Sequence, residues 1–238
     1  MPEYLHLDFR PRNAGWIAQL QTRARNSSSQ KVRARYETWA ESGLGQLALS
    51  LATKLEVRDR VARRFRDLMQ TLLAEVDGAE DLGYLLEGGY VFTPGDSGIL
   101  YDTCAAVDSV IFESRSAYEM TGKFVTRFCE VILNRRVTQE DLIRVLTDAG
   151  QDVAWIQELR DSRILFFHNT APWIALEIHA RDPLQFQLVV MKENLENFDD
   201  RSKFITQEDL ANVWDGYERS MSALKSWLED QIDAAGTS

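Results

Sequence analysis

The sequence predicts a mainly α fold, a bundle of long helices with one β-hairpin inserted near residues 173–191. Apolar residues recur at helical spacing over long stretches, most clearly at 31–76 and 99–133. Between 173 and 191 the period changes to strict alternation, which is typical of strands. A helical bundle with a single hairpin accounts for both patterns.

The N-terminal third is expected to hold an irregular segment followed by two helices. Residues 1–30 are expected to be extended or irregular. Within 31–76, Gly43 and Gly45 should divide the helical pattern in two. Residues 77–98 are dense in glycine, which indicates a loop with a short extended piece.

A long helix is expected from Ile99 to Leu133. At about 1.5 Å per residue it would span about 50 Å, which suits a bundle better than a compact mixed sheet. The residues expected to face inward are Val107, Val110, Ile111, Tyr118, Phe124 and Phe128.

Two later segments, VTQEDLIRVL from residue 137 and ITQEDLANVW from residue 205, have the pattern of helix starts. In each, a threonine can cap the helix and an aspartate follows three positions later, as in a capping box. The pairs are Thr138 with Asp141 and Thr206 with Asp209. The second start should open a closing helix from about Gln207 to Ile232.

The alternating stretch reads as a hairpin with one apolar face, turning at Arg181-Asp182-Pro183. An isolated hairpin is only marginally stable, so it must pack on helices or pair at an edge with another chain. No linker rich in proline, glycine or serine divides the chain. We therefore expect residues 31–238 to form one helical-bundle domain.

Composition indicates a folded, non-secreted protein. Hydrophobic residues make up 45% and charged residues 27% of the chain. No window approaches 18 uncharged apolar residues, and no basic start is followed by an apolar run. A cytoplasmic protein with no membrane partner is expected. Cys104 and Cys129 fall inside a helical pattern and are expected to be buried thiols.

Charge is distributed unevenly along the chain. The formal net charge is -10, yet residues 1–70 carry 13 Lys and Arg against 7 Asp and Glu. The densest basic stretch is RDRVARRFR, with Arg58 and Arg63 among its five arginines. It can be a strip that meets nucleic-acid phosphates, or the solvated face of a helix.

Metal and cofactor chemistry find little support in the sequence. His179 and Glu177 share one strand face at i and i+2, but no further histidine or cysteine cluster completes a ligand set. No metal and no cofactor are therefore expected.

The segment ELRDSRILFFHNTAPW, residues 158–173, carries the candidate chemistry. Pro172 should end the preceding helix, so that His168 falls near its last turn. There the helix dipole favours the imidazolium and raises the pKa of the histidine. Arg160 and Arg163, one turn apart, can hold a phosphate. Proton transfer and charge stabilisation are what metal-free RNA transesterification needs.

Helix geometry favours a site shared between two chains. Arg163 and His168 point about 140° apart on a straight helix, so one helix presents the pair poorly. A second copy packed across a two-fold axis would bring both residues into one cleft. The alternative is structural, with His168 capping the helix beside Asn169 and the arginines in ion pairs.

The six residues from Arg163 to His168 match the RxxxxH spacing of HEPN domains, and the surrounding pattern is similar to theirs. These are helical modules that dimerise and in many members act as metal-independent endoribonucleases. The resemblance covers about residues 99–234. It implies that Arg163 contacts phosphate and stabilises the transition state and that His168 is the acid and base. The residues then expected to bind phosphate are Arg160, Asn169, Arg58 and Arg63.

The resemblance implies a homodimer that binds or cleaves RNA, in a toxin or defence setting, with an antitoxin or another protein as a possible partner. A non-catalytic homodimeric interaction or scaffolding protein is the alternative. It is favoured by the acidic C-terminal two thirds and by Ile164, which stands where active members usually carry Asn, Asp or His.

Overall fold

The computed structural model describes residues 14–77, 90–92, 98–168, 173–181, 184–191, 198–200 and 203–235. The elements in chain order are α1 (Gly15–Arg25), α2 (Gln30–Glu37), α3 (Leu44–Asp77), β1 (Tyr90–Phe92), α4 (Gly98–Val131), α5 (Gln139–Asp148), α6 (Ala154–His168), β2 (Trp173–Arg181), β3 (Leu184–Met191), β4 (Phe204–Thr206) and α7 (Gln207–Ala234).

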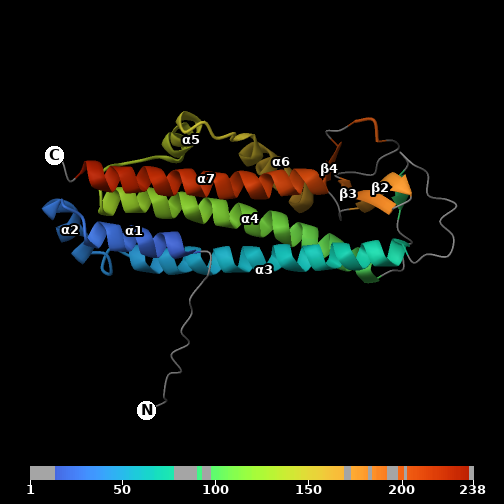
Figure 1. The fold of residues 1–238 in the computed structure, drawn as a ribbon, viewed down its shortest axis with the longest axis horizontal. Coiled ribbons are helices and arrows are strands. Elements are labelled where there is room, and N and C mark those ends of the chain that lie inside the picture. Colours follow the sequence, from blue (N-terminus) through green and yellow to red (C-terminus); the bar gives the residue numbers. More distant parts are fainter. Residues whose placement is uncertain are drawn as a thin grey trace, which may run out of the picture.

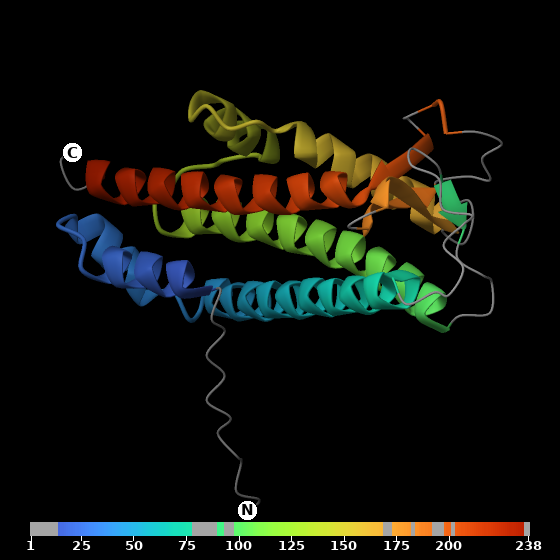
Figure 2. The ribbon, with the colours of Figure 1, turned by 45° about the vertical axis from the view of Figure 1, so that its right-hand side comes forward.

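The long helices α3, α4 and α7 run side by side along the long axis, and α1 lies against one half of them (Figure 1). The strands gather at the end where α3 finishes and α7 begins, while α5 and α6 lie on the side of α7 away from α3 (Figure 2). This arrangement confirms the mainly α fold with an inserted hairpin. Among the described residues, no helix has the apolar length that crossing a membrane requires.

The central helix α4 supplies much of the core. All six residues that the sequence expected to face inward are buried, and Val107, Phe124 and Phe128 have no exposed surface. The division of the N-terminal pattern into α2 and α3 is also confirmed. Gly43 lies in the turn between them with a φ of +75°, a conformation that glycine adopts without strain.

The expectation of an irregular segment over residues 1–30 is wrong where α1 forms. Ile17, Leu20 and Ala24 follow helical spacing and are buried. The Trp16 ring packs edge-on against Phe124 of α4 with 5.6 Å between centroids. Tertiary burial of this short apolar stripe stabilises a helix that its own sequence supports only weakly. Residues 1–13 lie outside the described residues.

The predicted hairpin is confirmed, and it forms the middle of a four-stranded antiparallel sheet in the order β1-β2-β3-β4. Ile174, Leu176 and Ile178 face the main core, as the alternation predicts. The opposite face is also partly covered, because a second small cluster contains Ala175, Val189, Met191 and Phe204. The expected single apolar face was therefore incomplete.

Both predicted capping boxes are present. The Thr138 hydroxyl accepts a hydrogen bond from the Asp141 amide at 3.2 Å, and the Thr206 hydroxyl accepts one from Asp209 at 3.2 Å. Each aspartate in turn accepts the threonine backbone N–H. These reciprocal bonds satisfy amide donors that would otherwise be unpaired at the helix start. β4 leads directly into the second box, so the sheet and α7 have a fixed junction.

A close approach at Gly216 fixes α6 against α7. A Cβ atom added there would lie 2.5 Å from Cγ and Cδ1 of Trp155. Trp155 is buried, and its ring meets Tyr118 of α4 and Tyr217 of α7 edge-on, with centroids 5.5 and 6.0 Å apart. Its Nε1 donates a hydrogen bond to Ser220 Oγ at 3.2 Å. The missing side chain at Gly216 therefore lets Trp155 join three helices.

Gly216→Ala should lower the free energy of unfolding by about 1–3 kcal/mol, although alanine has the better helix propensity. The clash with a buried ring outweighs that gain of about 1 kcal/mol. Urea denaturation measures the change. Gly15→Ala is the matched control, because a Cβ there meets nothing within 4 Å. Equal stability of Gly216→Ala and the wild type would contradict the close-packing account.

Candidate functional site

The helix that carries the RxxxxH spacing is α6, and it ends at His168. His168 therefore lies in the last described turn of α6, as the sequence predicts, while residues 169–172 lie outside the described residues. The first half of α6 is anchored in the core by Trp155 and Leu159, both buried. Its outer face carries Arg160, which is exposed to solvent. Because α6 is anchored through its buried side, Arg160 on the opposite side is accessible to a ligand.

The structure places the predicted catalytic pair only by its backbone. Arg163 and His168 both belong to the helical span of α6, five positions apart. Their side chains lie outside the described residues, and Asn169 lies outside them altogether. The catalytic roles of Arg163 and His168 therefore remain predictions. The structure places only their backbone, within α6.

Arg58 is the predicted phosphate ligand that the structure corrects. Both sequence interpretations of RDRVARRFR placed it at the surface, but its side chain is only 2% exposed. It crosses from α3 to α7, where its guanidinium carbon lies 3.6 Å from the centroid of Trp214 and 4.0 Å from that of Tyr217. Its Nη1 donates to Glu218 Oε1 at 2.8 Å. A surface RNA phosphate does not reach it in this arrangement.

Arg63 keeps the exposed position that the sequence predicts, with 58% of its side chain accessible. Arg60, Arg64 and Arg66 are exposed on the same helix. The charge is partly balanced, because Glu56 Oε1 lies 3.1 Å from Arg60 Nε and 3.8 Å from Arg63 Nη2. The exposed basic surface of α3 therefore consists of Arg60, Arg63, Arg64 and Arg66 and does not include Arg58.

A buried polar cluster around Tyr217 escaped the sequence reasoning. Its hydroxyl shares a 2.9 Å hydrogen bond with Thr121 of α4. Burial raises the pKa of Tyr217 to about 12, so it stays protonated near neutral pH. The pairing of Tyr217 with Thr121 and Arg58 depends on tertiary contacts between distant helices, which the sequence does not reveal.

The two cysteines differ in their burial. Cys129 is fully buried, and desolvation raises the pKa of its thiol to about 12, which keeps it protonated. Cys104 is half-buried, and burial likewise raises its pKa. The buried-thiol expectation is therefore confirmed for Cys129 and only partly for Cys104.

The possible metal pair on β2 is loosely arranged. His179 Nε2 lies 3.8 Å from Glu177 Oε2, too far for a strong hydrogen bond. Across the described part of the chain, no group of three or more His, Cys, Asp or Glu side chains comes together as metal ligands.

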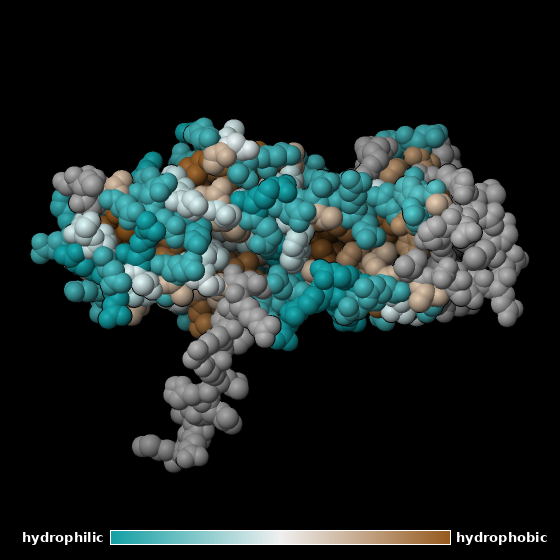
Figure 3. Space-filling model, viewed as in Figure 1, coloured by the Kyte–Doolittle hydropathy of each residue, from teal (hydrophilic) through white to brown (hydrophobic). Residues whose placement is uncertain are grey.

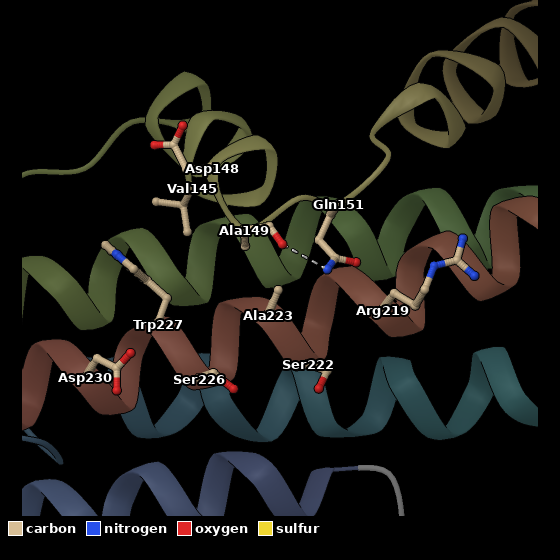
Figure 4. A pocket seen from close by; sticks show the side chains of 10 residues that line it. All are labelled: Val145, Asp148, Ala149, Gln151, Arg219, Ser222, Ala223, Ser226, Trp227 and Asp230. Atoms are coloured by element: carbon tan, nitrogen blue, oxygen red, sulfur yellow. Dashed lines mark hydrogen bonds between the residues drawn. The ribbon is translucent and has the colours of Figure 1, made fainter.

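A separate cavity of about 620 Å³ lies between α5 and α7. Trp227 and Val145 lie toward one end of it, and Ala149 and Ala223 lie nearer its middle (Figure 4). Arg219 lies at the opposite end from Trp227. The cavity is wide and open, and its mixed lining does not converge on one chemical group as a catalytic site would.

Comparison of the chain with family models, curated proteins and solved structures gives no match.

The burial of Arg58 predicts unequal effects of two substitutions on α3. Arg58→Ala should lower the free energy of unfolding by about 2–4 kcal/mol, because it leaves a cavity between two aromatic rings. Arg60→Ala, on an exposed side chain, should change it by no more than about 0.5 kcal/mol. Chemical denaturation of both variants measures the difference. Similar small effects would show that Arg58 belongs to the solvated face.

Proposed function

We propose that the chain is an RNA-binding, HEPN-like protein that cleaves RNA without a metal ion, using Arg163 and His168 at a homodimer interface. The observation that carries the proposal is the position of His168 as the last residue of α6. At that end the helix dipole stabilises the imidazolium, which suits a group that gives and takes a proton near neutral pH.

In the proposed reaction, His168 removes the proton from the ribose 2′-hydroxyl, which then attacks the adjacent phosphorus. His168 then returns this proton to the 5′-oxygen, which leaves as a hydroxyl when its bond to phosphorus breaks, and the strand ends in a 2′,3′-cyclic phosphate. Arg163 neutralises charge on the phosphorane. Because the pair diverges by about 140° on one helix, we propose that the arginine of one copy serves the histidine of the other.

The RNA backbone would contact the exposed arginines. Arg160 lies on the outer face of α6, and Arg63 lies on the exposed face of α3. Arg58 is no longer included, because its guanidinium is enclosed between two rings. A cytoplasmic setting and an antitoxin or other protein partner belong to the same proposal.

A non-catalytic interaction protein is the second candidate function. It is supported by large apolar side chains on the exposed face of α4, where Tyr101 is 66% and Phe112 41% exposed. Eleven positions apart, they lie on the same side of the helix and would suit a protein surface better than RNA. This candidate expects a stable complex and no cleavage.

Purified protein should cut single-stranded RNA in the presence of a chelator and leave cyclic phosphate ends. His168→Ala should reduce the rate by at least about 100-fold, because it removes the general acid and base. Mass spectrometry of the products and gel assays measure both. His179→Ala is the matched control, since His179 is exposed on β2 away from α6. Cleavage that survives His168→Ala would exclude the catalytic role.

Subunit mixing tests whether the site is shared. Arg163→Ala and His168→Ala should each be inactive alone. Mixed in equal amounts, half of the dimers would be heterodimers with one complete site of two, which should restore about a quarter of the wild-type activity. Gel assays after exchange of subunits measure it. Two inactive variants that stay inactive after proven exchange would exclude sites built from both chains.

A further inference from the structure

Arg58 has hydrogen-bond donors that no group in the described structure satisfies. Its Nε and Nη2 are both buried and make no hydrogen bond, while Nη1 is paired with Glu218. Buried polar atoms nearly always have a partner, and an unpaired buried donor is costly when it belongs to a charged group. These two atoms therefore need a functional explanation.

The unpaired atoms form one edge of the guanidinium. The N–H of Nε and one N–H of Nη2 point in the same direction, which is the edge that accepts two oxygens of one anion side by side. Glu218 takes only Nη1 and leaves this edge open. Arg58 is therefore prepared for a bidentate partner.

The aromatic rings restrict the shape of that partner. Trp214 and Tyr217 cannot occupy the same face of the guanidinium at 3.6 and 4.0 Å, so they hold it between them. A group that meets the open edge must lie near the guanidinium plane. A planar carboxylate does so with both oxygens, whereas a tetrahedral phosphate projects its other oxygens toward the rings.

Nearby charge also favours a carboxylate. Glu218 already lies against Arg58, and Asp59 is the next residue on α3. Both carboxyl groups add negative charge to the surroundings of the guanidinium. A singly charged carboxylate adds less repulsion than a phosphate dianion.

The site borders a gap in the helix packing. Trp16, in the first turn of α1, packs on Phe124, whereas Tyr217 beside Arg58 is bonded to Thr121. Thr121 lies three residues, or about 4.5 Å, nearer the sheet end of α4, so α1 stops about one turn short of Arg58. Beyond it, recessed hydrophobic surface is visible between α7 and α3 (Figure 3).

One wall of the Arg58 sandwich can give access to the open edge. Tyr217 is 1% exposed and lies on the inner side, whereas Trp214 is only partly buried. Trp214 therefore borders solvent, whereas Tyr217 is held inside by its bond to Thr121. A ligand that reaches Arg58 must approach from the Trp214 side.

We infer that the Nε and Nη2 edge of Arg58, held between Trp214 and Tyr217, is a carboxylate-binding site. The carboxylate can come from a free small molecule or from this chain. Glu3 and Asp8 precede α1, whose first turn lies next to the gap. The site is independent of the proposed RNA chemistry, because it uses neither Arg163 nor His168.

The test uses the full chain and acetate as the probe, against inorganic phosphate and chloride at equal ionic strength. Acetate in hundredfold excess over its Kd should raise the Tm by about 5 °C. It should also shift the ¹⁵N–¹H signal of the Arg58 Nε. Arg58→Met should lose the rise in Tm, and its spectrum identifies the Arg58 Nε signal as the one that is missing. Arg60→Met is the matched control on the exposed face and should keep both the rise in Tm and the shifted Arg58 signal.

A variant with Glu3→Gln and Asp8→Asn distinguishes the two sources. If the ligand is free, this variant and the wild type should respond alike to acetate. If the chain supplies its own carboxylate, the wild type should respond weakly, while the variant should melt lower and gain the acetate response. The inference is overturned if neither protein shows an acetate response that requires Arg58, or if phosphate acts equally well.

Discussion

The insertion of Trp155 over Gly216 is the contact on which the arrangement of both candidate sites depends. It sets the distance between α6 and α7, and the same ring touches Tyr118 of α4. The direction in which α6 leaves the core, and thus the position of its last turn, follows from this junction. A functional helix end needs such an anchor, because a helix of 15 residues is marginal on its own.

The long helices and the hairpin could be predicted because their periods are strong and their ends carry local signals. The threonine caps at 138 and 206 act through neighbouring residues alone, so sequence suffices to find them. α1 was missed for the opposite reason. Its stripe of Ile17, Leu20 and Ala24 is short, and the helix is stabilised by contacts with α4 and α7 that lie far away in sequence.

The candidate site shows the same division between local and tertiary information. Pro172 predicts that His168 lies in the last turn of α6. The burial of Arg58, in contrast, cannot be predicted from its basic neighbours. A usable signal existed, because Leu51, Leu55 and Arg58 continue one buried stripe at helical spacing. An arginine on an apolar stripe indicates a buried partner. The sequence does not show which partner this is. Only the fold reveals that it is a pair of aromatic rings on α7.

Tyr217 connects the two regions, since its ring meets Trp155 of α6 at 6.0 Å and Arg58 of α3 at 4.0 Å. A carboxylate at Arg58 would order one side of this ring, and RNA at the end of α6 would act on the helix anchored at the other. If one ligand changes the affinity for the other, the coupling must be equal in both directions. The physical requirement is that the buried rings hold two distinct arrangements, and Trp214 is the one ring of the pair around Arg58 that is not fully buried.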